Sequence, residues 1–132
     1  EWGGAGLVRA PGPAVRAGFP SPAGDYVEER LDLSRLVVRD PAATFYFRMQ
    51  GEAMTGAGIF PGDILVVDRS LPAAPGRVVV AVVAEELLVR RLEASPGGVR
   101  LAAEGTGGVS LPVPPDAVLE IWGVVTYVLH RP

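Results

Sequence analysis

The chain has 132 residues, which is enough for one domain with a hydrophobic core of its own. It has no cysteine and a single histidine, which excludes disulfides, thiolate chemistry, cysteine-type zinc sites and multi-histidine metal sites. The formal net charge of −3 argues against broad nucleic-acid binding, and we expect neither a metal nor a cofactor.

Residues 1–24 are rich in glycine and proline and show no hydrophobic periodicity. This pattern predicts an extended N-terminal arm, followed by a folded domain over residues 25–132. No apolar run approaches the length of a transmembrane helix, and the start of the chain does not resemble a signal peptide. We therefore expect a cytoplasmic protein with no membrane attachment.

The first periodic segment predicts a short helix, because Leu33, Leu36 and Val37 have the i, i+3, i+4 spacing of one helical face. Asp32 is placed to cap this helix at its start. The helix should end before Pro41, since the residue preceding a proline disfavours helical geometry.

The rest of the chain is a series of short apolar segments separated by turns rich in proline and glycine. The predicted strands are residues 44–49, Ile64–Asp68, Val78–Val83, 87–92, 99–103 and 118–129. Many short strands with little helix predict a mainly β fold. Gly123 indicates a bulge or a close backbone approach in the last strand, which is either a dimer edge or a central core strand.

A glycine-containing turn follows the strand at 44–49 and leads into the sequence Gly51-Glu52-Ala53-Met54. Side chains at such a corner project from a rigid point, where backbone amides are free of helical partners. A nucleophile at this place would have donors ready for an oxyanion. Taken alone, the sequence is more typical of a plain structural turn.

Seven segments must be considered together, and these are residues 15–18, 18–28, 40–46, 51–54, 61–68, 88–92 and 119–125. Together they resemble the LexA/UmuD family of self-cleaving Ser-Lys proteins (peptidase S24), and within it the UmuD branch. They follow the family's order without large gaps. The resemblance implies curved antiparallel sheets with one or two short helices and an extended N-terminal arm.

Position by position, the resemblance places Ala53 at the nucleophile, where the family has serine, and Arg90 at the general base, where the family has lysine. The amides of Glu52 and Ala53 would line the oxyanion hole, and the bond to be cut would be Ala17–Gly18. Alanine has no attacking atom. Arginine, whose pKa lies far above neutral, holds its proton at neutral pH. We therefore expect this chain, although it resembles a peptidase family, to be unable to cleave itself as written.

Because a buried guanidinium is costly without a carboxylate, we expect Arg90 to turn toward solvent or to pair with an aspartate or glutamate. Arg91 should face the opposite side of its strand. Two origins are consistent with alanine at position 53 and arginine at position 90. Either the chain is a natural pseudo-protease, or Ala53 replaces a serine in order to block self-cleavage.

The resemblance implies an SOS-response protein whose arm is removed when a RecA filament on single-stranded DNA stimulates self-cleavage. The shortened homodimer would then join the catalytic subunit of a translesion DNA polymerase. The arm would dock by strand addition, in its own cleft or in its partner's.

The alternative is the C-terminal regulatory and dimerisation domain of a LexA-type or phage repressor. About 24 arm residues cannot hold a helix-turn-helix, so we expect no sequence-specific DNA binding by the chain as given. A signal-peptidase-like membrane enzyme is disfavoured by the missing membrane anchor.

Overall fold

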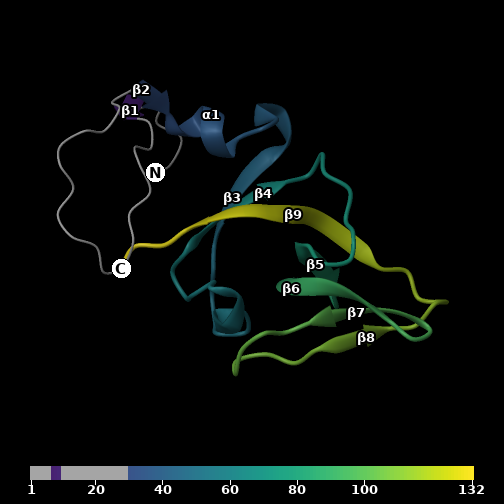
Figure 1. The fold of residues 1–132 in the computed structure, drawn as a ribbon. Coiled ribbons are helices and arrows are strands. Elements are labelled where there is room, and N and C mark those ends of the chain that lie inside the picture. Colours follow the sequence, from purple (N-terminus) through teal and green to yellow (C-terminus); the bar gives the residue numbers. More distant parts are fainter. Residues whose placement is uncertain (1–6, 10–29) are drawn as a thin grey trace. The chain divides into compact units, whose positions relative to one another are not determined.

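The computed structural model describes residues 7–9 and 30–132, and the chain divides into two units, Glu1–Val37 and Val38–Pro132 (Figure 1). In the first unit, β1 (Leu7–Arg9) and β2 (Arg30–Asp32) form an antiparallel pair, followed by α1 (Leu33–Val37). The amide of Ser34 donates to the carboxylate of Asp32 at 3.0 Å, which confirms the predicted cap. The predicted cleavage site, Ala17–Gly18, and the predicted boundary after residue 24 lie outside the described residues.

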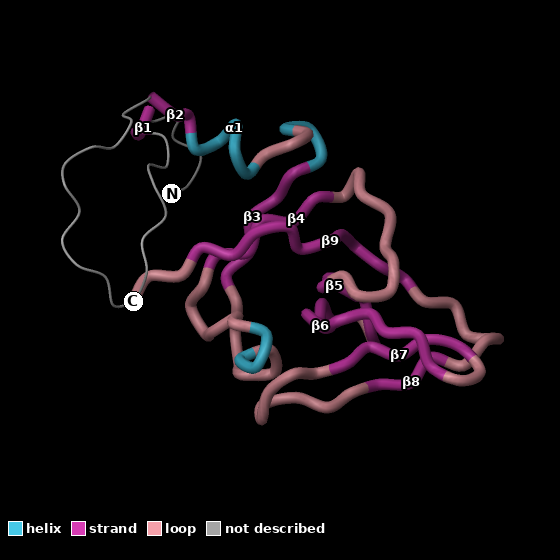
Figure 2. The backbone as a smooth tube through the Cα atoms, viewed as in Figure 1, coloured by secondary structure: helices cyan, strands magenta, loops and turns pink. Residues whose placement is uncertain are grey.

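The second unit is built on one antiparallel sheet of seven strands in the order β3-β4-β9-β5-β6-β7-β8. The strands are β3 (Thr44–Arg48), β4 (Ile64–Asp68), β5 (Val78–Val83), β6 (Glu86–Ser95), β7 (Gly98–Ala102), β8 (Leu111–Val113) and β9 (Glu120–Leu129). Figure 2 shows that helix in this unit is limited to short turns, which are η1 (Pro41–Ala43) and η2 (Thr55–Ala57). The mainly β prediction is therefore confirmed.

Two clusters of buried side chains form the core of this unit. The first packs beside the corner after β3 and consists of Met49, Ala53, Met54, Ile59, Leu65, Val67 and Val80. The second lies along the middle of the sheet and consists of Val79, Ala81, Leu92, Leu101 and Val124. The continuous apolar runs of β4 and β5 fit central strands with both faces covered. The corner is therefore anchored in the core.

The last strand, β9, lies between β4 and β5 and pairs with both. Of the two alternatives, the central core strand is confirmed and the dimer edge is wrong. The predicted irregularity is also present, since the pairing of β9 shifts register against β4 and again against β5. A Cβ at Gly123 would lie 2.6 Å from a methyl carbon of Val67, so the predicted close approach is confirmed.

Asp63 joins the C-terminal residues to the turn before β4. Its buried carboxylate accepts a hydrogen bond from the amide of Phe60 at 2.8 Å and lies 2.6 Å from Nδ1 of His130. Burial alone raises the pKa of Asp63, but the hydrogen bonds from Phe60 and His130 outweigh it and lower the pKa. The ionised carboxylate is therefore favoured in the folded state.

Replacing Asp63 with asparagine is expected to lower the free energy of unfolding at pH 7 and to weaken its dependence on acid pH. A carboxyl group whose pKa is lowered by folding stabilises the protein above its unfolded pKa, near about 4. That contribution is lost as pH falls through the folded pKa. Urea denaturation between pH 2 and pH 7 measures it, with exposed Asp116→Asn as the control. Matching profiles for wild type and Asp63→Asn would contradict this role.

Candidate active site

The corner after β3 buries the position that the resemblance assigns to the nucleophile. Ala53 is 6% exposed and Met54 is 0% exposed. Gly51 has φ of 83°, in the left-handed region that glycine favours, and this lets the chain turn sharply. The helical turn η2 begins at Thr55, two residues after Ala53. The corner is thus rigid, with the methyl group of Ala53 against protein rather than water.

A loop of residues 103–110, between β7 and β8, lies against this corner. The carbonyl of Ala53 accepts a hydrogen bond from the amide of Glu104 at 2.8 Å, and the amide of Gly56 donates to the carbonyl of Glu104. The amide of Ala103 donates to the hydroxyl of Ser110 at 3.0 Å, which closes the base of the loop. Backbone contacts therefore fix the loop relative to Ala53.

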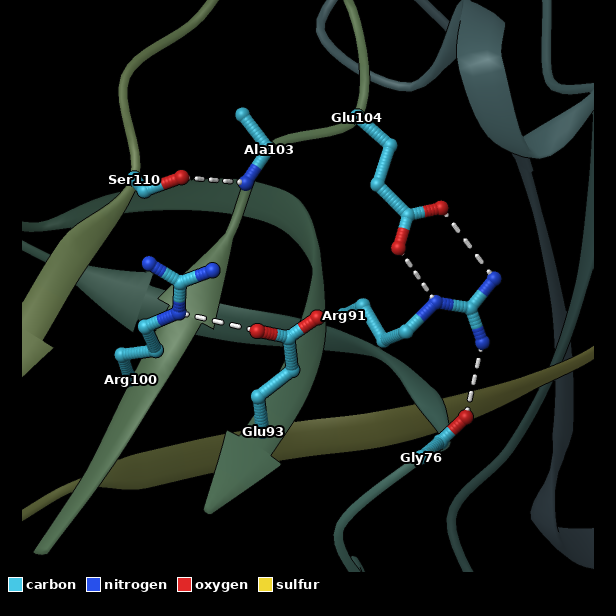
Figure 3. A network of polar contacts seen from close by, with 7 residues as sticks. All are labelled: Gly76, Arg91, Glu93, Arg100, Ala103, Glu104 and Ser110. Carbon is cyan, nitrogen blue, oxygen red and sulfur yellow. Dashed lines mark hydrogen bonds and ion pairs between the residues drawn. The ribbon is translucent and has the colours of Figure 1, made fainter. Parts of the chain in front are cut away.

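Arg91, on β6, anchors the same loop through its side chain (Figure 3). Its Nε donates to Glu104 at 2.6 Å, its Nη2 donates to the other carboxylate oxygen at 3.3 Å, and its Nη1 donates to the carbonyl of Gly76 at 2.7 Å. The hydrogen bond to Glu104 raises the pKa of Arg91. Arg91 is therefore a structural cation, held on Glu104.

The loop approaches the corner closely because it is rich in glycine. A Cβ at Gly105 would overlap the carbonyl oxygen of Glu52 and would lie 3.0 Å from the carbonyl carbon of Ala53. A Cβ at Gly107 would lie 2.9 Å from the backbone nitrogen of Glu52. Backbone atoms cannot yield as flexible side-chain ends do, so these positions require glycine.

The Gly105→Ala substitution is expected to lower the free energy of unfolding by about 1–3 kcal/mol, because its methyl group has no room beside the corner. Thr106→Ala, at an exposed site in the same loop, is the control and should change it by about 0.5 kcal/mol or less. Urea denaturation compares the two variants. Equal stability of both would show that the loop does not pack on the corner.

Arg90 lies beside Ala53, although 37 residues separate them in the sequence. Both side chains line one cleft of about 260 Å³, together with residues 47–51 and 87–89. A Cβ at Gly108 would lie 2.5 Å from the Cβ of Ala53 and 2.9 Å from Nη2 of Arg90, so both groups flank the same glycine. The structure thus brings the predicted nucleophile and base positions together.

The expectation that Arg90 would turn to solvent or pair with a carboxylate was wrong. Arg90 is 8% exposed, and its Nε donates to the carbonyl of Val109 at 3.1 Å while its Nη1 donates to the carbonyl of Val89 at 2.8 Å. Two neutral acceptors replace part of its hydration. Burial lowers the pKa of Arg90, but arginine starts so high that it stays protonated at neutral pH. The cleft therefore contains a cation and not a base.

The amides of Glu52 and Ala53 have no hydrogen-bond acceptor within the described ranges, whereas the carbonyl of Ala53 is paired with Glu104. Free amides at a rigid corner are what an oxyanion hole requires. Their assignment to such a hole stays a prediction.

Glu104, Gly105 and Gly108 contribute to the site without having been predicted from the sequence. The only signal was the run Gly105-Thr106-Gly107-Gly108, which indicates a loop but not the corner on which it lies. In residues 7–9 and 30–132, no three histidine, aspartate or glutamate side chains gather as metal ligands. No helix in the described part of the chain is long and apolar enough to cross a membrane.

Comparison with known proteins identifies the family. Residues 10–126 match the family model described as Peptidase S24-like. Protein MucA of Escherichia coli is 42% identical over 115 residues, which cover 87% of this chain and 79% of MucA. Protein ImpA of Shigella flexneri is 41% identical over 116 residues, covering 88% and 79%. The LexA repressor of Dechloromonas aromatica is 38% identical over 105 residues, covering 80% of this chain and 52% of the repressor. The chain therefore belongs to the Peptidase S24-like family, as a UmuD-like member.

Proposed function

We propose that this chain is an SOS-response protein of the UmuD type that keeps the cleft of a self-cleaving peptidase without its cutting chemistry. The observation that carries the proposal is the placement of Ala53 and Arg90 side by side in one cleft. A methyl group cannot attack a peptide bond, and a protonated guanidinium cannot take a proton from a nucleophile. The matches to MucA and ImpA support the UmuD-type assignment.

The open edge of β6 offers a place for an extended peptide. Residues 86–91 of β6 pair with β5, but pairing with β7 begins only at Arg91. Residues 87–89 therefore have, among the described residues, a partner strand on one side only, and they line the cleft. A peptide can add to such an edge through main-chain hydrogen bonds. We propose the arm around Ala17–Gly18 as the occupant, from the same chain or from a partner.

In the proposed cycle, residues 1–24 act as the regulatory arm and residues 25–132 act as the binding module. The protein is a cytoplasmic homodimer that meets the RecA filament on single-stranded DNA. With both catalytic groups restored, removal of the arm lets the shortened homodimer join the catalytic subunit of a translesion DNA polymerase, whereas the chain as written stays uncut. It needs neither a cofactor nor direct reading of DNA sequence. A second candidate is the regulatory domain of a cleavable repressor, which the match to the LexA repressor favours.

Restoring both catalytic groups tests the proposed function. The double variant Ala53→Ser, Arg90→Lys is incubated with a RecA filament assembled on single-stranded DNA, and the fragments are weighed by intact-mass spectrometry. We expect two fragments separated between Ala17 and Gly18, which form faster with the filament than with RecA lacking DNA. A double variant that stays whole, or whose cutting ignores the filament, would count against the UmuD-type role.

A further inference from the structure

Arg90 carries a buried charge that no carboxylate of the described residues neutralises. Arg91 pairs with Glu104 and Arg100 pairs with Glu93. The hydrogen bonds of Arg90, in contrast, go only to backbone carbonyls. These carbonyls occupy its Nε and Nη1, while Nη2 has no acceptor within residues 7–9 and 30–132. A buried donor without an acceptor is costly, and the cost is greater for a charged group. An anion that enters the cleft would relieve both deficits.

The free end of this guanidinium lies in the cleft, beside Ala53 and against the backbone of Gly108. The loop packs closely on this side of the guanidinium, since a Cβ at position 108 would lie 2.9 Å from Nη2, so an acceptor for Nη2 must approach from the cleft. The amide of Ala53 is also without an acceptor among the described residues. A cationic donor and an unused amide, contributed by two residues that line one cleft, are groups that bind a carboxylate.

The charge of the cleft favours the free end of a peptide over its middle. A peptide added to residues 87–89 would run along β6 toward Arg90. There, the loop meets the corner, since a Cβ at Gly108 would lie only 2.5 Å from the Cβ of Ala53. A chain that terminates here places an anionic carboxylate beside Arg90, whereas a chain that continues offers only a neutral carbonyl at that point.

We propose that the cleft binds the free C-terminal carboxylate of an extended peptide, with Arg90 as its anchor. The inference rests on the proposed function only in treating the cleft as a peptide site. Arg90, which cannot act as a base, would thus allow the cleft to bind peptides with a free C-terminal carboxylate. A peptide with the sequence of residues 11–17, which ends in alanine, is a natural probe.

The test compares three labelled peptides by fluorescence polarisation with the full chain. The first is residues 11–17 with a free carboxylate, the second is its C-terminal amide, and the third continues through residue 20. We expect the acid to bind at least about tenfold more tightly than either other peptide, because a charge-assisted hydrogen bond is lost in both. An arm already in the cleft weakens all three alike and leaves the ratio unchanged.

Arg90→Met keeps a long apolar side chain without charge and is expected to abolish the preference for the acid. The matched control is Arg100→Met, which removes an arginine from β7, away from the cleft, and should keep the preference. Gly108→Ala crowds Nη2 and the Cβ of Ala53 and should reduce the preference even if Arg90→Met fails to fold. Circular dichroism establishes which variants are folded.

Equal affinity for acid and amide in the unaltered chain, or binding of neither, would overturn the carboxylate site. So would a preference for the acid that survives in folded Arg90→Met. Cutting of the double variant Ala53→Ser, Arg90→Lys without any carboxylate preference here would keep the proposed function and reject this inference. A clear preference for the acid, with no cutting of the double variant, would keep this inference and reject the proposed function.

Discussion

A chain carrying Ala53→Ser alone is expected to stay whole, whereas adding Arg90→Lys should allow self-cleavage at a rate that rises with pH. A serine hydroxyl must lose its proton to attack, and the guanidinium of Arg90 cannot accept it. A lysine in the same buried position has a pKa lowered by desolvation and can become neutral. Supplying a general base typically raises a rate by about 10²–10⁴-fold. Intact-mass measurements between pH 6 and pH 10 compare the two variants.

The neighbouring arginine provides the matched control. Arg91 is held on Glu104 by two hydrogen bonds and does not line the cleft with Ala53. Ala53→Ser combined with Arg91→Lys should therefore remain as uncut as the single variant. Equal cutting with lysine at either position, or without any lysine, would remove Arg90 from the base position.

The Met54→Ala substitution is expected to lower the free energy of unfolding by about 2–5 kcal/mol, the usual range for emptying a buried site of this size. Met54 is 0% exposed and packs in the core cluster that also contains Ala53. Its carbonyl accepts hydrogen bonds from the amides of Ala57 and Ile59, so the same residue fixes the turn after the corner. Urea denaturation of the two proteins measures the loss.

Val109→Ala is the control for this experiment, because its side chain is 69% exposed although its carbonyl binds Arg90. Removing exposed methyl groups should change the free energy of unfolding by about 0.5 kcal/mol or less. If Met54→Ala were no more damaging than Val109→Ala, the corner would not be anchored in the core as described.

Local patterns in the sequence were sufficient for most of the sheet. β4 and β5 were predicted with their observed bounds, because runs of apolar residues between glycine and proline turns leave little ambiguity. β8 was missed, since it has three residues with Pro112 at its centre, and proline disfavours a strand assignment. The sequence left open whether β9 was central or at an edge, because local composition does not predict which distant strands pair with it.

The candidate site was found by resemblance rather than by composition, and its details depended on distant backbone. The expectation for Arg90 considered only carboxylate partners or water. The structure instead supplies the carbonyl of Val109, 19 residues further along the chain, on a loop that reaches the corner because its glycines have no side chains. Arg91 shows the opposite outcome, since its partner Glu104 is a charged residue of the same loop.

The most direct measurement is the intact mass of the unaltered chain after prolonged incubation with a RecA filament on single-stranded DNA. With alanine at position 53 and a protonated guanidinium at position 90, the chain should keep its full mass while the double variant Ala53→Ser, Arg90→Lys loses its arm. Fragments from the unaltered chain that separate between Ala17 and Gly18 would contradict the account, because some other pair of groups would then be cutting the bond.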